Sequence, residues 1–336
     1  MTRNYCSYFD HRYMPRGLAM IRSLRRFEPA APIWVLCLDE LCFQLMSAIN
    51  EPNVRLIGME EFEEGDEGLA AARKDRSLVE YYFTCTPSLV RFVLQRAAEG
   101  DTVTYLDADL FFFSDPSPLH AELGSDSVAI VAHRFTEELR DREEYGKYNV
   151  GWLTFRNDER GRAVQEWWRN RCNEWCFDRL EGDRFADQKY LERFGELFKG
   201  VVALAHDGAN VAPWNIGRYD VTCREGAVFI DDRPLVFFHF HGLKALGEVA
   251  YRAPHRAYRA PFGHEIRRRI YRPYVRELAS ISRELRARGL KLSRVLSRES
   301  RSTARRHGAA QVGKTFEFLA AFMRREVLLV VAGRAI

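Results

Sequence analysis

Two aspartates separated by one residue form the segment with the clearest chemical potential. Asp107 and Asp109 follow the apolar stretch 102–106 and precede the apolar run 110–113. In an extended chain, residues i and i+2 project to the same face, so the two carboxylates converge. The carboxyl end of a buried strand is where α/β sheets bind ligands, and paired oxygen ligands there suit Mg²⁺ or Mn²⁺ on a diphosphate. A pair of solvated turn aspartates is the alternative, and the apolar flanks on both sides disfavour it.

Two histidines near the end of another apolar run offer further ligands. His239 and His241 lie in the run 234–241, and the same parity places both on one side of a strand. Imidazole is a borderline ligand that, added to two aspartates, favours Mn²⁺ over Mg²⁺. Two histidines on a strand are more often structural when they stand alone, and the aspartate pair shifts the balance toward a metal site. Lys244, just beyond Gly242, could neutralise a phosphate as a point charge.

Two weaker polar groups come from the middle of the chain. Asn149 and Gly151 enter a strand-like segment, and Asp187 and Gln188 open a helical pattern. Each is weak alone, because asparagine and aspartate also serve as helix caps.

The elements that must position these residues alternate between strand and helix. Expected strands are 4–9, 32–38, 54–57, 102–106, 126–132, 150–155 and 234–241, and expected helices are 15–27, 40–50, 87–98 (opened by Pro87) and 161–176. Continuous apolar runs such as 32–38 are typical of buried parallel strands. The pattern predicts an α/β fold with a mixed, mainly parallel sheet flanked by helices.

These pieces, in this order, resemble the family-eight retaining glycosyltransferases and their bacterial relatives, which have the nucleotide-diphospho-sugar transferase (GT-A, Rossmann-like) fold. The resemblance covers roughly residues 3–245. It is carried by the N-terminal strand and helix, the DxD segment, the Asn-x-Gly strand, the Asp-Gln pair, the Ala-Pro-Trp-Asn segment and the His-x-His-Gly-x-Lys segment, at 5–24, 105–119, 149–151, 187–188, 212–215 and 239–244. A DxD motif is common in isolation, and the other motifs in this order make it fairly specific.

The resemblance implies a role for the metal residues. Asp107 and Asp109 would hold a divalent metal, Mn²⁺ or Mg²⁺, on the donor diphosphate, with His239 as the histidine ligand. His241 stays open as the alternative. The family's lysine stands three residues after the glycine, whereas Lys244 stands two after Gly242.

The resemblance also implies donor and sugar contacts. The base-binding loop would run over residues 8–13, where Tyr8, Asp10 and Tyr13 would bind the nucleotide. Arg91 corresponds to a basic residue directed toward the donor. The groups around the sugar would be Asn149, Asp187 and Gln188, which are the catalytic candidates.

The composition changes near residue 263. The whole chain has 51 Lys and Arg against 47 Asp and Glu, yet 18 of those basic residues and only 6 of the acidic ones lie from His264 onward. We therefore expect a catalytic domain at 1–262 and a basic amphipathic helical tail at 263–336. The apolar stripe Ile266, Ile270, Tyr274 and Leu278 among arginines suits either an anionic lipid surface or packing on protein.

Several classes of protein are disfavoured. No window of about 18 apolar residues predicts a membrane span, and no secretory signal is expected, so the predicted location is cytoplasmic, with peripheral contact at the inner face of the plasma membrane through the tail. Seven scattered cysteines without a CxxC pair argue against a disulfide framework or zinc site. No aromatic-basic module accompanies the arginines, so a nucleic-acid partner is not expected.

The sequence thus favours a metal-dependent glycosyltransferase of the hexosyltransferase type. It would move a sugar from a nucleotide-diphosphate donor, a UDP-sugar, to a glycan or glycolipid hydroxyl in bacterial surface polysaccharide or lipopolysaccharide synthesis. One alternative is a non-catalytic sugar-nucleotide-binding or scaffold protein. A haloacid-dehalogenase-type phosphatase is weaker, because Phe111 stands where that motif has Thr or Val. The donor sugar, the acceptor and the oligomeric state stay open.

Overall fold

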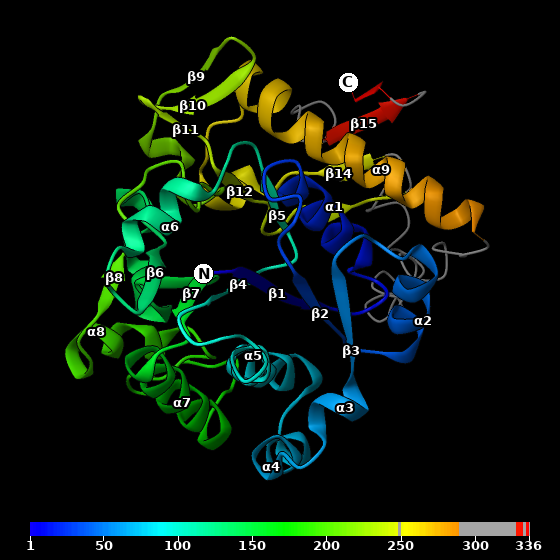
Figure 1. Cartoon of the computed structure of the whole chain (residues 1–336). Helices are drawn as coiled ribbons and strands as arrows, with labels where there is room; N and C mark the ends of the chain where they lie inside the picture. Colours follow the sequence, from blue (N-terminus) through cyan, green and yellow to red (C-terminus); the bar gives the residue numbers. More distant parts are fainter. Residues whose placement is uncertain (248–249, 289–326, 332–333, 336) are drawn as a thin grey trace, which may run out of the picture.

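A seven-stranded sheet forms the centre of the molecule (Figure 1). The computed structural model describes residues 1–247, 250–288, 327–331 and 334–335. The strands are β1 (Arg3–Phe9), β2 (Ile33–Cys37), β3 (Val54–Gly58), β4 (Thr102–Leu106), β6 (Val128–Ala132), β7 (Tyr148–Arg156) and β8 (Val201–Ala203), in the order β3-β2-β1-β4-β7-β6-β8. All pairs are parallel except those of β7 with β4 and β6. The expected mixed, mainly parallel α/β fold is confirmed.

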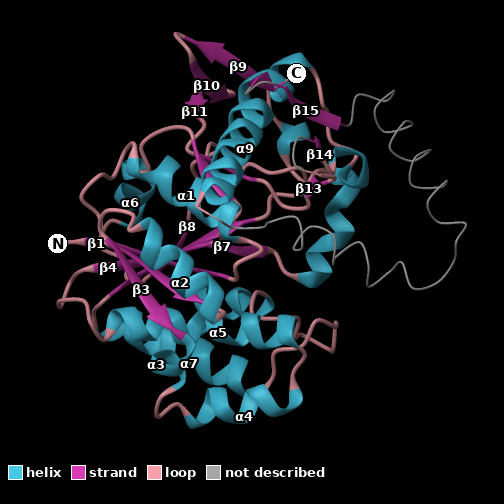
Figure 2. Cartoon of the chain, turned by 90° about the vertical axis from the view of Figure 1, so that its right-hand side faces the viewer, coloured by secondary structure: helices cyan, strands magenta, loops and turns pink. Residues whose placement is uncertain are grey.

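Helices cover both faces of this sheet (Figures 1 and 2). One face carries α1 (Met14–Arg25), α2 (Glu40–Ile49), α6 (Ser117–Leu123) and α9 (Arg272–Ala287). The other carries α3 (Met59–Glu63), α4 (Glu67–Asp75), α5 (Leu78–Leu94), α7 (Glu159–Glu174) and α8 (Phe194–Leu197). Each face has its own buried apolar cluster, and β2 and β4 are buried along their whole length because helices lie on both sides of them.

Helix α5 begins earlier than the sequence predicts. Pro87 was expected to open a helix, but it lies inside α5. The start is set instead by a capping box: the Ser77 side chain accepts a hydrogen bond from the Glu80 backbone, and the Glu80 carboxylate accepts one from the Ser77 backbone. This box satisfies two backbone donors at the helix end, which outweighs the preference of proline for a first turn.

The chain leaves the central sheet after the aspartate pair. Following β4, a turn leads into the short strand β5 (Leu110–Phe112), which pairs antiparallel with β12 (Phe237–His239). The expected strand 234–241 is therefore divided: its start belongs to β11 (Arg233–Pro234), beside β10 (Ala227–Ile230) and β9 (Val221–Arg224). The pairing of β5 with β12 places Leu110 opposite His239.

The first part of the C-terminal segment packs on the α/β core. A π-helical turn (Ile266–Tyr271) continues into α9, and its apolar stripe is buried, with the Tyr274 ring stacked on Phe240 at 3.8 Å between centroids. On the polar side, Arg22 of α1 pairs with Glu284 at 2.7 Å. For this stripe the structure shows protein packing, the second of the two expected roles.

The remaining described part of the tail adds a small sheet. Strand β15 (Val327–Val331) pairs with β14 (Ala250–Arg252), flanked by β13 (Lys244–Ala245) and β16 (Arg334–Ala335). Residues 289–326 of the predicted tail lie outside the described residues. Among the helices that the structure describes, none has the length and apolar character needed to cross a membrane.

Candidate metal and ligand site

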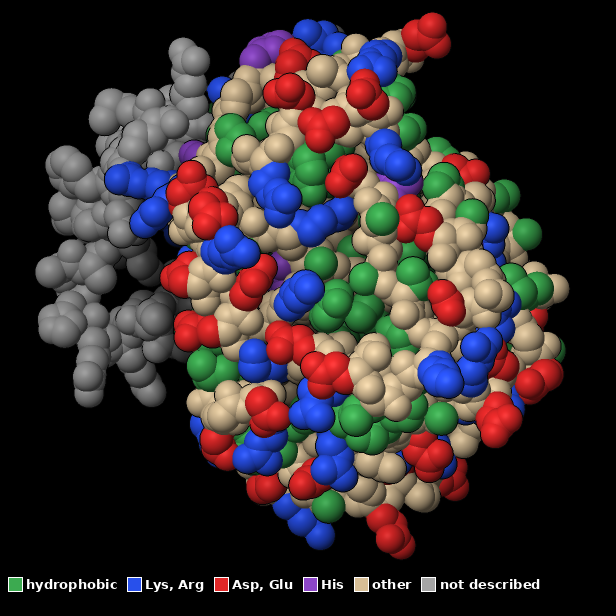
Figure 3. Space-filling model, turned by 90° about the vertical axis from the view of Figure 1, so that its left-hand side faces the viewer, with side chains coloured by type: hydrophobic (Ala, Val, Ile, Leu, Met, Phe, Trp, Pro, Cys, Tyr) green, Lys and Arg blue, Asp and Glu red, His purple; other side chains and the backbone are tan. Residues whose placement is uncertain are grey.

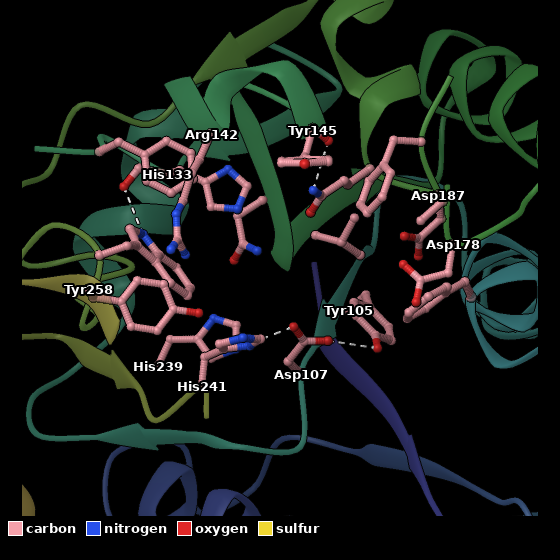
Figure 4. Close-up of a pocket in the computed structure, with 18 of the residues that line it drawn as sticks. Tyr105, Asp107, His133, Arg142, Tyr145, Asp178, Asp187, His239, His241 and Tyr258 are labelled. Atoms are coloured by element: carbon pink, nitrogen blue, oxygen red, sulfur yellow. Dashed lines mark hydrogen bonds and ion pairs between the residues drawn. The ribbon is translucent and has the colours of Figure 1, made fainter. Parts of the chain in front are cut away.

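Strands β4 and β12 bring the predicted metal residues together (Figure 4). The Nε2 atom of His239 lies 3.1 Å from Oδ1 of Asp109 and 3.6 Å from Oδ2 of Asp107. Asp109, His239 and His241 offer ligand atoms that all lie within 4.8 Å of one another. His239 is buried and His241 is exposed, so His239 approaches the site from the interior and His241 from its open side.

A glycine makes this approach of His239 possible. A Cβ atom on Gly151 would lie 3.0 Å from Nδ1 of His239 and 2.5 Å from Oδ1 of Asn149. The Asn149 side chain in turn accepts a hydrogen bond from the Gly151 backbone at 3.1 Å. The Asn-x-Gly strand is thus a close-packed support for the histidine.

The carboxylates and the imidazole shift each other's pKa. Burial alone raises the pKa of Asp109, but attraction to His239 outweighs it and holds the pKa well below its usual range. Burial alone lowers the pKa of His239, but Asp109 and Asp107 outweigh it and raise the pKa. Burial raises the pKa of Asp107. The hydroxyls of Tyr105 and Tyr13 donate to Asp107 and Asp109, at 3.0 and 3.3 Å.

This donor set fits a divalent cation. Two carboxylates and two imidazoles form a mixed oxygen and nitrogen set of the kind that suits Mn²⁺. The buried Nδ1 atom of His239 has no hydrogen-bond partner among the described residues, whereas its Nε2 atom faces both carboxylates. The ring therefore directs its bonding atom toward the cluster.

A cavity of about 440 Å³ opens beside the cluster and is bounded on its far side by Asp187. The Asp187 carboxyl is buried, and this burial raises its pKa to about 7, with Asp107 adding to the shift and the Thr86 hydroxyl opposing it. Its backbone carbonyl accepts a hydrogen bond from the Trp168 indole at 2.8 Å. Asp187 is therefore a buried carboxyl on an anchored backbone, and its charge changes near neutral pH.

Three other predicted residues line the same cavity: Tyr8, Asn149 and Gln188. The Gln188 amide donates to the backbone carbonyl of Tyr145 at 2.9 Å, and the Tyr8 hydroxyl lies 3.3 Å from that of Thr86. The predicted residues that line this cavity thus come from five separate parts of the chain.

The loop after β1, which the sequence predicts to bind the nucleotide, lies next to the Asp109 and His239 cluster. Asp10 accepts hydrogen bonds from the backbones of Arg12 and Tyr13, at 3.0 and 2.8 Å, and so shapes the turn. Tyr13 is partly exposed and reaches Asp109. Asp10 and Tyr13 border the site without lining the cavity.

The structure does not bring Lys244 or Arg91 to the cavity. Gly242 turns the chain with a φ of 73°, and Lys244 then pairs with Arg252 in the small sheet, where its side chain is exposed. Arg91 lines a different pocket, beside Glu61 and Glu64. Thr86, on the same helix, contacts the cavity residues Tyr8 and Asp187, and a residue five positions later on the helix points about 140° away from it.

Sequence reasoning missed a cation in the cavity wall. Arg142 lies 4.8 Å above the Tyr258 ring, and its guanidinium donates to the Ala257 carbonyl at 3.3 Å. Figure 4 shows it beside His133 and above the histidine pair. Although His241 is exposed at the surface, partial desolvation of its ring lowers its pKa, and the charges of His239 and Arg142 add to that shift. Arg142 comes from a mixed-charge segment whose residue pattern carries no site signal.

The Ala-Pro-Trp-Asn segment builds the wall behind the histidines. The Trp214 indole donates to the carbonyl of His133 at 2.9 Å, and the Asn215 amide donates to the same carbonyl at 2.8 Å. The Trp214 ring contacts His239 and His241, with centroids 5.1 and 5.7 Å apart. Burial lowers the pKa of His133 to about 3, so this histidine is neutral.

Two proteins of Bacillus subtilis (strain 168) are similar to this chain over most of its length. YfnF, an uncharacterized protein, is 31% identical over 276 residues, which is 79% of this chain and 90% of YfnF. The chain belongs to the YfnF family. YfnD, also uncharacterized, is 31% identical over 250 residues, covering 74% of this chain and 80% of YfnD. No family model matches the chain.

Solved structures share parts of the architecture at low identity. The glycosyltransferase GlyE of Streptococcus pneumoniae TIGR4 has 20% identity and a TM-score of 0.41, and the match covers 65% of this chain and 47% of GlyE. The galactosyltransferase LgtC has 19% identity and a TM-score of 0.42, covering 62% and 76%. Mouse xyloside xylosyltransferase 1 has 10% identity and a TM-score of 0.46, covering 72% and 98%.

Proposed function

We propose that the chain is a metal-dependent glycosyltransferase of GT-A type that moves a sugar from a nucleoside-diphosphate donor to a hydroxyl acceptor. The observation that carries the proposal is the meeting of Asp107 and Asp109 with His239 at the mouth of a cavity. A binding site at the carboxyl end of β4 agrees with the position of ligands in α/β sheets. The order of motifs along the sequence supports the same assignment.

The chain's own residues divide the work between the two ends of the cavity. Asp107, Asp109, His239 and His241 would hold the metal, which when bound neutralises charge on the diphosphate leaving group. Arg142 lines the cavity beside the histidines, so its guanidinium supplies a second positive charge for that group.

The polar groups on the far wall would bind the sugar. Asp187 and Gln188 are held by hydrogen bonds to their neighbours, and Asn149 is fixed by Gly151. Such prepositioned groups can steady positive charge that develops on the sugar carbon as the leaving group departs. Tyr8 and the loop to Tyr13 would bind the base, which the resemblance suggests is uracil.

The finer assignment rests on the resemblance. It comprises a UDP-hexose donor, Mn²⁺, retention of configuration by same-face attack of the acceptor hydroxyl, and a glycan or glycolipid acceptor in surface polysaccharide or lipopolysaccharide synthesis. The domain limit at 262 and 263 and peripheral membrane contact through the tail belong to the same proposal.

One observation favours a second candidate, a sugar-nucleotide-binding protein without turnover. Lys244, expected at the phosphates, is exposed on β13 and does not line the cavity. Arg142 offers a replacement charge at the site, and we therefore favour the enzyme.

A donor screen tests the proposal. The full chain with Mn²⁺ is incubated with UDP- and GDP-sugars, and release of nucleoside diphosphate is measured for the wild type, Asp109→Ala and the control Asp232→Ala. Asp232 is an exposed carboxylate paired with Arg224, so its loss leaves the cavity intact. We expect turnover that requires Mn²⁺ and is lost only in Asp109→Ala. Equal turnover by both variants refutes the site, and binding of UDP without turnover of any donor establishes the second candidate.

A further inference from the structure

A second, basic cleft lies behind the strand that follows the aspartate pair. It has a volume of about 580 Å³, and its lining includes residues 226–228 of the β9–β10 hairpin and residues 272, 273 and 276 at the start of α9. Figures 1 and 2 show that the start of α9 lies beside this hairpin. Five arginines, from the residue that follows α1, the π-helical turn and α9, line it: Arg26, Arg268, Arg269, Arg272 and Arg276. Residues distant in sequence thus converge on one concave surface.

Most of this positive charge is not neutralised. Arg26 and Arg269 each have a carboxylate partner at 3.4 Å. Within the described part of the chain, no acidic side chain pairs with Arg268, Arg272 or Arg276. The Nε atom of Arg272 is buried and has no hydrogen-bond partner among the described residues. A concave site lined by one sign of charge raises the local concentration of anions.

The floor of the cleft is aromatic. Phe27, Phe111 and Phe113 line it together with the arginines, and the Arg26 guanidinium lies 5.4 Å above the Phe111 ring. An apolar floor excludes water from the arginines and strengthens their attraction for a bound anion.

The cleft differs from other surfaces of the molecule. On the face that carries α6 and α8, acidic and basic side chains are interspersed, as Figure 3 shows. This face therefore lacks the concentration of positive charge that lines the cleft.

We propose that this arginine cleft binds a phosphate group. Guanidinium groups present paired N–H donors that match phosphate oxygens, and several arginines together suit a dianion or a diphosphate. The phosphate could belong to a lipid headgroup, whose apolar chain would suit the phenylalanines, or to a soluble molecule. The inference does not depend on the proposed transferase activity, because none of the cleft residues lines the cavity.

Two probes distinguish the two sources of phosphate. Calorimetry measures inorganic pyrophosphate binding to the full chain in EDTA, which silences the metal site. Cosedimentation measures binding to phosphatidylcholine vesicles with and without phosphatidic acid. Both are done on the wild type, the double variant Arg268→Gln with Arg276→Gln, and the single variant Arg276→Gln. Arg268 and Arg276 are exposed, so their replacement leaves the core intact, and thermal unfolding checks this.

A control on the same helix tests whether the cleft itself matters. Arg283→Gln removes an exposed arginine two turns beyond Arg276, outside the cleft. We expect the double variant to weaken binding by about tenfold or more, and Arg283→Gln to change it less than about twofold. Loss with pyrophosphate assigns a soluble phosphate, and loss only with acidic vesicles assigns a lipid headgroup. Wild type that binds neither probe, or equal loss in Arg283→Gln and the double variant, overturns the proposal.

Discussion

The cavity and the arginine cleft lie on two sides of the same pair of strands, β5 and β12. The cavity side carries carboxylates, whereas the cleft side carries arginines. On the cavity side, the turn before β5 and the end of β12 present Asp109 and His239, which contact each other directly. On the cleft side, Phe111 of β5 lies under the Arg26 guanidinium, and among the described residues Arg268, Arg272 and Arg276 have no carboxylate partner. One short antiparallel pair of strands thus separates a site suited to a cation from a site suited to an anion.

Removing the central histidine separates the two sites most strongly. In His239→Ala, we expect Mn²⁺-dependent turnover to fall by about 1000-fold, because the buried metal ligand is lost. Phosphate binding in the arginine cleft stays unchanged. Kinetics and Mn²⁺ calorimetry check the first effect, and pyrophosphate calorimetry checks the second. His264→Ala, at an exposed histidine paired with Glu265, is the control. Equal turnover in the two histidine variants would remove His239 from the site.

Filling the space behind the histidine should disturb the cavity without removing a ligand. Gly151→Ala places a Cβ atom 2.5 Å from Oδ1 of Asn149 and 3.0 Å from Nδ1 of His239, so the amide must move and the ring is pressed away from the added methyl group. A displacement of this kind costs about 100-fold in turnover. Gly195→Ala, where a Cβ atom meets nothing within 4 Å, is the matched control. Steady-state kinetics at saturating Mn²⁺ decides, and unchanged kinetics in Gly151→Ala would mean that the ring position is not important.

Replacing Arg142 and Lys244 one at a time shows which basic side chain contacts the diphosphate of the donor. Arg142→Gln should lower kcat/KM for the sugar donor by about tenfold or more, because a charge-assisted contact to phosphate is lost. Lys244→Gln should leave kcat/KM unchanged, because Lys244 is exposed and outside the cavity. The opposite pattern in donor kinetics would return the phosphate role to the lysine.

The smallest effect concerns stability and pH. The pKa of Asp187 is about 7 in the folded protein, above that of an unfolded aspartate, because of burial. The folded state therefore binds the proton more tightly, and this group's contribution to stability falls as pH rises from about 4 to 7. In EDTA, Asp187→Asn should remove this loss and be more stable than wild type at pH 8 by about 1 to 3 kcal/mol. Denaturant unfolding at several pH values measures it; parallel stability curves for the two proteins would contradict it.

Much of the fold follows from local signals in the sequence. The buried strand 102–106 and the helix after residue 14 lie close to their predicted limits, because apolar periodicity fixes such elements. The predicted start of α5 at Pro87 was wrong, because the capping box of Ser77 and Glu80 begins the helix nine residues earlier, at Leu78.

Two features bring the predicted metal residues together: the alternation of side chains along each strand and the pairing of two strands that are distant in sequence. Asp107, Asp109 and His239 meet because strand parity and the β5–β12 pairing leave few alternatives. Arg91 and Lys244 lie away from the cavity, because helix phase and the turn at residue 242 decide where they point. The arginine cleft joins separate segments, so no local pattern could have predicted it.

The affinity of UDP with and without Mn²⁺ tests the central claim most directly. Calorimetry compares the wild type with Asp109→Asn, a change that keeps the size of the side chain and removes its charge. The account predicts that Mn²⁺ strengthens UDP binding to the wild type by about tenfold or more and has no effect on the variant. UDP binding that is equally strong with and without Mn²⁺, or equally strengthened in both proteins, would contradict a metal-held diphosphate at this site.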